Sequence, residues 1–105
     1  MKRLAASAVG CALLSAAAFA ATGTVISQRG KVFNPGEVTI PAGTVLKIAN
    51  DDEVLHHVYI ESPDLDFDSG EQEPGRTIEI KFDRSGTYVA KCAIHPKMHL
   101  TVIVQ

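Results

Sequence analysis

Hydrophobic and polar residues alternate along several short stretches of this chain. The pattern is clearest in residues 77–82, where Ile78, Ile80 and Phe82 share one parity and Thr, Glu and Lys occupy the other. A period of two is typical of a strand with one buried and one solvated face. Turn signals such as Asn-Pro-Gly at 34–36 separate the stretches. The pattern predicts strands at Thr24–Ser27, Lys31–Phe33, Glu37–Ile40, Thr44–Asn50, Leu55–Ile60, Arg76–Phe82, Thr87–Cys92 and His99–Val104.

These strands indicate an all-β fold. Beyond residue 20, Val and Ile together number 17 and Leu numbers four, a bias toward the β-branched residues that suit pleated sheet. No stretch of helical periodicity is long enough to serve as a crossover helix. We therefore expect an antiparallel sandwich or barrel of about seven to eight strands.

The first 20 residues follow a different pattern. Lys2 and Arg3 precede an uncharged run rich in Ala, Leu and Val, which ends in Ala18-Phe19-Ala20. A charged start, an apolar run and a small-x-small ending are the features of a cleavable signal peptide. The run is too short and too rich in Ala for a membrane span, and a lipoprotein signal at Cys11 is the weaker alternative. The chain thus divides into a signal peptide, residues 1–20, and one domain, residues 21–105.

Removal of this signal changes the composition. The net charge moves from −2 to −4 because Lys2 and Arg3 leave, and Cys92 becomes the one remaining cysteine because Cys11 leaves as well. A mildly acidic domain of this size is unlike a basic nucleic-acid-binding protein or a multidomain enzyme. Export implies an oxidising compartment, yet a single thiol forms no internal disulfide. Cys92 is either a buried small hydrophobic residue or part of a binding site.

The residues that follow Cys92 have the chemistry of metal ligands. Cys92, His95 and Met98 are spaced C-x2-H-x2-M, so one tight loop can bring a thiolate, an imidazole and a thioether to the same point. Cys and Met are soft donors that suit copper, and two His with one Cys and a long axial Met describe an electron-transfer copper site. A structural zinc site is disfavoured because zinc prefers Cys, His and carboxylates. The copper site needs a second imidazole from elsewhere in the chain.

His56 and His57 are the candidates for this second imidazole. In an extended strand His56 shares its parity with Ile60, on the apolar side that faces the core, and Cys92 has the inward parity of its own strand. We therefore predict His56 as the ligand. Whether His57 or His99 also contributes to metal binding stays open.

These motifs resemble those of the cupredoxins, the small blue copper proteins that include plastocyanin, pseudoazurin and amicyanin. The resemblance rests on Asn50-x5-His56-His57-Val58, on Gly86-x-Tyr88-x3-Cys92-x2-His95-Pro96-x-Met98, and on the upstream run from Phe33 to Gly43. The short spacing of the last three ligands is most similar to that of amicyanin. The resemblance implies a Greek-key β-sandwich with a tyrosine corner at Tyr88. It also implies one type 1 copper ion per chain, with the ligands His56, Cys92, His95 and Met98.

The function implied by the resemblance is electron transfer. We expect a small exported protein that shuttles single electrons between redox partner proteins, such as a cytochrome or an oxidoreductase, and that is not an enzyme. We expect it in the periplasm as a monomer, without nucleic acid and without stable membrane insertion after signal cleavage. The alternative is a periplasmic copper-binding protein for delivery or storage. Delivery sites favour exposed Met and His clusters, whereas this domain has a single Met, Met98.

Residues 61–73 carry six acidic side chains and no Lys or Arg. The run Asp64-x-Asp66-x-Asp68 has the beginning of a calcium loop, but its sixth position is Ser69 where Gly is required and its twelfth is Gly75 where Glu is required. We interpret the stretch as a solvated acidic loop. The alternative is an acidic patch that steers a basic redox partner.

Overall fold

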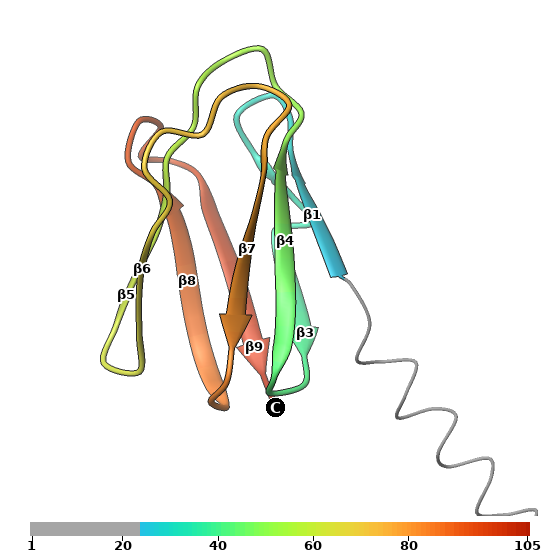
Figure 1. Ribbon diagram of the computed structural model, residues 1–105, viewed down its shortest axis with the longest axis vertical. Coiled ribbons are helices and arrows are strands. Elements are labelled where there is room, and N and C mark those ends of the chain that lie inside the picture. Colours follow the sequence, from blue (N-terminus) through green and yellow to red (C-terminus); the bar gives the residue numbers. More distant parts are fainter. Residues whose placement is uncertain (1–23) are drawn as a thin grey trace, which may run out of the picture.

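Two β-sheets pack face to face in this protein (Figure 1). The computed structural model describes residues 24–105, which form nine strands and no helix. The predicted signal peptide and its cleavage point after Ala20 lie outside the described residues. In the described part, no helix is long and apolar enough to cross a membrane.

The first sheet has the strand order β2-β1-β4-β7 and the second has the order β3-β9-β8-β5-β6. The strands of the first sheet are β1 (Thr24–Gln28), β2 (Phe33–Asn34), β4 (Thr44–Asn50) and β7 (Thr77–Phe82). Those of the second sheet are β3 (Glu37–Ile40), β5 (Val58–Ser62), β6 (Leu65–Asp68), β8 (Gly86–Cys92) and β9 (His99–Val104).

The core lies between the two sheets and follows the predicted alternation. In β7, Ile80 and Phe82 are buried while Glu79 and Lys81 are exposed. Each such apolar side chain contributes about 1.5–3 kcal/mol when it is fully buried. Tyr88 packs edge-on against the Phe82 ring, with the ring centroids 5.3 Å apart. Its hydroxyl donates to the Arg84 carbonyl oxygen at 2.8 Å, as a tyrosine corner does.

The all-β sandwich is confirmed, but its sheets are mixed rather than purely antiparallel. β1 pairs with β4 in parallel, and β3 pairs with β9 in parallel. The chain leaves the first sheet after β2, forms β3 in the second sheet and returns for β4. The excursion through β3 brings the chain back to the end of the sandwich where β1 began, so β4 can run parallel to β1.

Three predictions about strands differ from the structure. Lys31 lies in the turn between β1 and β2 with φ 61°, so the strand predicted from Lys31 begins only at Phe33. The strand predicted from Leu55 begins at Val58, because the preceding residues form the loop that holds His56. The acidic stretch, which was predicted to be a solvated loop, contains the strand β6. Its apolar side chains Leu65 and Phe67 alternate with acidic residues and pack against the core.

Candidate metal centre

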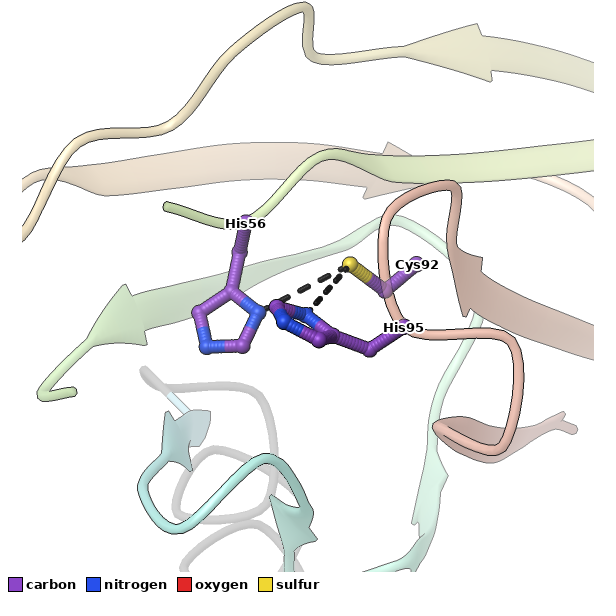
Figure 2. A group of neighbouring side chains, drawn as sticks. All are labelled: His56, Cys92 and His95. Carbon is purple, nitrogen blue, oxygen red and sulfur yellow. Dashed lines mark hydrogen bonds between the residues drawn. The ribbon is translucent and has the colours of Figure 1, made fainter. Parts of the chain in front are cut away.

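Three segments bring His56, Cys92 and His95 together at one end of the sandwich (Figure 2). Cys92 is the last residue of β8 and is 2% exposed. His56 lies in the loop between β4 and β5 and is fully buried. His95 lies in the loop between β8 and β9 and is half-buried. His56, 36 positions before Cys92, and His95, three positions after it, thus face the same sulfur atom.

The distances in this cluster suit a single metal ion. The Cys92 Sγ lies 3.6 Å from Nδ1 of His56 and 3.6 Å from Nδ1 of His95, and one donor atom from each of the three residues lies within 4.8 Å of the others. Metal–nitrogen bonds of about 2.0 Å and metal–sulfur bonds of about 2.3 Å, at angles of about 110–120°, separate the two donors by roughly 3.5–3.7 Å. The donor atoms therefore already have the spacing that one ion requires.

Hydrogen bonds fix the backbone amide, the carbonyl oxygen and the ring of His56. Its amide donates to the Gln72 carbonyl oxygen at 3.0 Å, and its own carbonyl oxygen accepts from the Gln72 amide at 2.7 Å. The Nε2–H of the ring donates to Oδ2 of Asp52 at 2.8 Å. A proton on Nε2 leaves Nδ1, the atom that faces Cys92, free to bind a metal.

Asp52 also anchors the neighbouring turn. Its carboxylate accepts hydrogen bonds from the Gly30 amide at 2.6 Å and from the Lys31 amide at 3.0 Å. Burial opposes ionisation of this group, but the hydrogen bonds from Lys31, His56 and Gly30 outweigh that effect and lower the pKa of Asp52. The carboxylate is therefore charged at neutral pH and is oriented by three donors.

His95 and Met98 belong to one compact loop. The Met98 amide donates to the His95 carbonyl oxygen at 3.0 Å, and the Met98 side chain is 2% exposed. The rings of His95 and His56 meet edge-on, with centroids 5.0 Å apart. Burial lowers the pKa of His95, and the nearby positive charge of Lys31 also lowers it. At neutral pH the imidazole of His95 is therefore neutral, which is the form that binds metal.

The structure places His57 and His99 away from this cluster. The side chain of His57 is 27% exposed, and its Nε2 lies 2.6 Å from Oδ1 of Asp68. His99 is exposed on β9, opposite Lys91. The backbones of the two ligand loops are joined directly, because the Ala93 amide donates to the His57 carbonyl oxygen at 2.9 Å.

A buried network of amide side chains supports the His56 loop, and no pattern in the sequence predicts it. Gln72 donates to the carbonyl oxygens of Ile48 and Arg76 at 3.0 and 2.8 Å and accepts from Gln28 at 2.7 Å. Asn50 donates to the Gln72 carbonyl oxygen at 2.9 Å. Gln28 and Gln72 have no local motif, and buried glutamines are visible only once the strands are placed in space.

A family model for the cupredoxin-like domain matches residues 3–104 of the sequence. The chain belongs to the cupredoxin-like family. This match covers nearly the whole chain, so the predicted resemblance is confirmed. A comparison with curated protein sequences gives no match.

Solved cupredoxins share the fold of this family member. A purple cupredoxin from Nitrosopumilus maritimus is 24% identical with a TM-score of 0.70, over 78% of this chain and 99% of that chain. A mutant amicyanin in its reduced state is 20% identical with a TM-score of 0.74, over 79% of this chain and 82% of that chain. A copper-containing nitrite reductase from Thermus scotoductus is 25% identical with a TM-score of 0.72, over 80% of this chain but 22% of that chain.

Copper is the ion that fits this donor set. Cys92 would supply a thiolate sulfur and His56 and His95 would supply imidazole nitrogens, a donor set that suits copper. Carboxylates, which magnesium and calcium require, are absent from the described cluster, since Asp52 contacts only the outer nitrogen of His56. These three residues of the cupredoxin-like domain can hold one copper ion.

Proposed function

We propose that this cupredoxin-like protein carries single electrons on one copper ion held by His56, Cys92, His95 and Met98. The observation that carries the proposal is the position of the Cys92 sulfur, 3.6 Å from Nδ1 of both histidines at the end of a strand. Copper, when bound, supplies one-electron exchange between Cu(I) and Cu(II).

The residues of this chain supply a rigid, dry setting for that exchange. Cys92 is held by the pairing of β8 with β5, and His56 by Gln72 and Asp52. Cys92, His56 and Met98 are each 2% exposed or less, so water is excluded from three of the four proposed donors. Ligands that hold the same positions in both oxidation states need little reorganisation when an electron arrives or leaves.

We propose that Met98 would be the fourth donor. It is buried at the end of the loop that carries His95, immediately before β9. Four protein donors leave no position for a substrate, which favours a carrier over an enzyme. The similar nitrite reductase is an enzyme, but this chain spans 22% of its length.

The proposal includes export. The signal-peptide pattern of residues 1–20 supports a periplasmic location after cleavage at Ala20. We propose that the mature protein acts there as a monomer and exchanges electrons with a cytochrome or an oxidoreductase. Mass spectrometry of protein from the periplasmic fraction tests this, and a chain that retains residues 1–20 would contradict it.

The copper assignment is tested by optical and EPR spectroscopy of the mature protein with Cu(II). We expect the intense visible absorption of a thiolate–Cu(II) site and its complete loss in Cys92→Ser. His56→Gly should lose the band, whereas His57→Gly, the matched control one residue away, should keep it. A colourless wild-type complex with ordinary Cu(II) spectra would refute the proposal.

A second measurement separates electron transfer from copper delivery. A carrier should show reversible voltammetry and should retain Cu(I) in the presence of a Cu(I) chelator. Rapid loss of Cu(I) to the chelator, without reversible voltammetry, would identify the metal as cargo.

A further inference from the structure

The four proposed metal ligands come from the two sheets unequally. Cys92 is the last residue of β8, and His95 and Met98 lie in the loop from β8 to β9, so these three donors belong to the second sheet. His56 lies in the segment that leaves β4 of the first sheet and enters β5 of the second. The position of His56 relative to Cys92 therefore depends on how this crossing segment is fixed.

In the described part of the chain, the backbone of His56 pairs with that of Gln72 alone. The two residues exchange both amide hydrogen bonds, at 3.0 Å and 2.7 Å, and form an isolated antiparallel bridge. Gln72 itself lies outside the strands, in the loop between β6 and β7. Two loop residues that pair with each other still need an attachment to the sheets, and the side chain of one of them can provide it.

The side chain of Gln72 provides this attachment to the first sheet. Its Nε2 donates to the carbonyl oxygen of Ile48 in β4 at 3.0 Å and to that of Arg76, the residue before β7, at 2.8 Å. Its Oε1 accepts from Nε2 of Gln28, the last residue of β1, at 2.7 Å. One buried amide group thus joins the His56 segment to three neighbouring strands of the first sheet.

The pair of buried glutamines is not explained by stability alone. Oε1 of Gln28 has no hydrogen-bond partner among the described residues, and a buried polar atom without a partner is destabilising. An apolar pair of the same shape would avoid that cost. Amide groups differ from apolar ones in that their hydrogen bonds fix direction as well as distance, and a network of them makes its surroundings rigid.

We infer that Gln72 is a positioning residue for the metal centre. Its side chain fixes the backbone of His56 relative to the first sheet, and so sets where Nδ1 of His56 lies relative to the Cys92 sulfur (Figure 2). Asp52 acts differently, because it contacts the ring of His56 and controls its orientation. The identity of the metal rests on the proposed function, whereas the position of His56 is a property of the metal-free protein as well.

Amide hydrogen exchange of the metal-free protein tests this positioning without any metal. Gln28→Met removes the donor to Oε1 of Gln72 and leaves the other two side-chain bonds of Gln72 in place, so we expect the variant to fold. The His56 amide, which donates to Gln72, should exchange about fivefold faster, the factor that corresponds to one lost hydrogen bond. The Met98 amide, which donates within the other ligand loop, should keep its rate.

Ile26→Met is the matched control for Gln28→Met. Ile26 is fully buried two residues earlier on the same face of β1, and cores tolerate a hydrophobic exchange of similar volume. The exchange rate of the His56 amide should therefore stay that of the wild type. Equal acceleration in the two variants would overturn the inference, because it would assign the effect to the packing of β1. An unchanged rate at His56 in Gln28→Met would overturn it as well.

Gln72→Met tests the complete attachment in the metal-loaded protein. Loss of an outer hydrogen-bonding partner of a metal ligand typically lowers metal affinity about 10–100-fold. We expect a loss in this range for Co(II), whose visible spectrum reports its thiolate and imidazole donors without a redox step. The thiolate-to-cobalt band should also shift, because Nδ1 of His56 is displaced. Gln28→Met should shift this band in the same direction by less.

Phe82→Ala is the control for lost stability. Phe82 is buried and pairs with Thr44, at the end of β4 that lies away from the His56 loop, and truncation of a buried Phe is strongly destabilising. The folded variant should bind Co(II) with the affinity and the spectrum of the wild type. Equal loss of affinity in Gln72→Met and Phe82→Ala would reduce Gln72 to a structural role and overturn the inference. A wild-type cobalt spectrum in both glutamine variants would do the same.

The two proposals fail in different measurements. A wild-type protein without a thiolate–copper band would overturn the proposed function, while faster exchange at His56 in Gln28→Met would still establish the positioning by Gln72. Conversely, a normal copper site together with unchanged exchange at His56 would overturn the positioning and leave the proposed function in place.

Discussion

Replacement of Gln72 by Met removes the centre of the buried amide network while it keeps the length of the side chain. Gln72 is 2% exposed and takes part in three side-chain hydrogen bonds. Two of them join the carbonyl oxygens of Ile48 and Arg76, and the third accepts the amide of Gln28. We expect Gln72→Met to be strongly destabilising.

The magnitude follows from the partners left behind. Each lost hydrogen bond costs about 1 kcal/mol, and a buried polar group left without a partner costs about 1–3 kcal/mol. Gln28 would retain a contact of 3.4 Å to the Ala49 carbonyl oxygen, beyond the usual range. The expected loss is about 3–5 kcal/mol, a large part of the roughly 4–12 kcal/mol that a domain of this size has in total.

A double-mutant cycle with Gln28→Met sharpens the prediction. Oε1 of Gln28 is a buried acceptor without a hydrogen-bond partner among the described residues, so Gln28→Met removes an unsatisfied group together with a good donor. The double variant should therefore be more stable than the sum of the two single losses predicts, by about 1 kcal/mol or more.

Urea unfolding of the metal-free protein, followed by circular dichroism, measures these differences. Gln105→Met, the same substitution at an exposed position, is the matched control and should change the stability by less than about 0.5 kcal/mol. A loss below about 1 kcal/mol for Gln72→Met, or strict additivity in the cycle, would refute the reasoning.

Two further predictions concern charge. Asp52→Asn removes a negative charge that lies one imidazole ring away from the proposed copper. At about 8 Å and an effective dielectric constant of about 20, the interaction between this charge and one unit of charge on the metal is worth about 2 kcal/mol. Because the lost charge favours the oxidised metal, voltammetry should show a reduction potential that is higher by roughly 90 mV. Asp51→Asn, at an exposed neighbour, should shift the potential far less. The hydrogen bond from the Gly70 amide lowers the pKa of Asp68. The charged Asp68 carboxylate therefore contributes stability above the ordinary carboxyl pKa, and this contribution is lost as the pH falls through the lowered pKa. Asp68→Asn should therefore differ from wild type in urea unfolding at pH 7 and converge with it near pH 2; a gap that is constant with pH would argue against this.

Most of the predictions that the structure confirms came from the alternation of apolar and polar residues along single strands, which shows which side chains face the core. His56 lies inside with Val58 and Ile60, and His57 faces out, as a period of two requires. The same reasoning placed Cys92 at the inner face of β8. These features depend on residues within a few positions of one another, and they are visible in the sequence.

The features that escaped prediction depend on contacts between distant segments. The conformation of Lys31 is stabilised by a carboxylate 21 positions away, and the burial of Gln72 by strands that end near residues 28 and 48. β6 was missed for a different reason: Leu65 and Phe67 alternate with acidic residues at an edge strand, so the average composition of the stretch is that of a solvated loop. The parallel pairs likewise follow from the path of the chain between sheets.

The carboxylate of Asp52 gives two properties of this protein a common origin. It orients the imidazole that is proposed to bind copper, and it holds the backbone of the left-handed turn at Gly30 and Lys31. A change at this position should therefore disturb a metal donor and the order of the β1–β2 turn at the same time. The affinity for copper and the conformation of a turn far from it in sequence are thus coupled through one side chain.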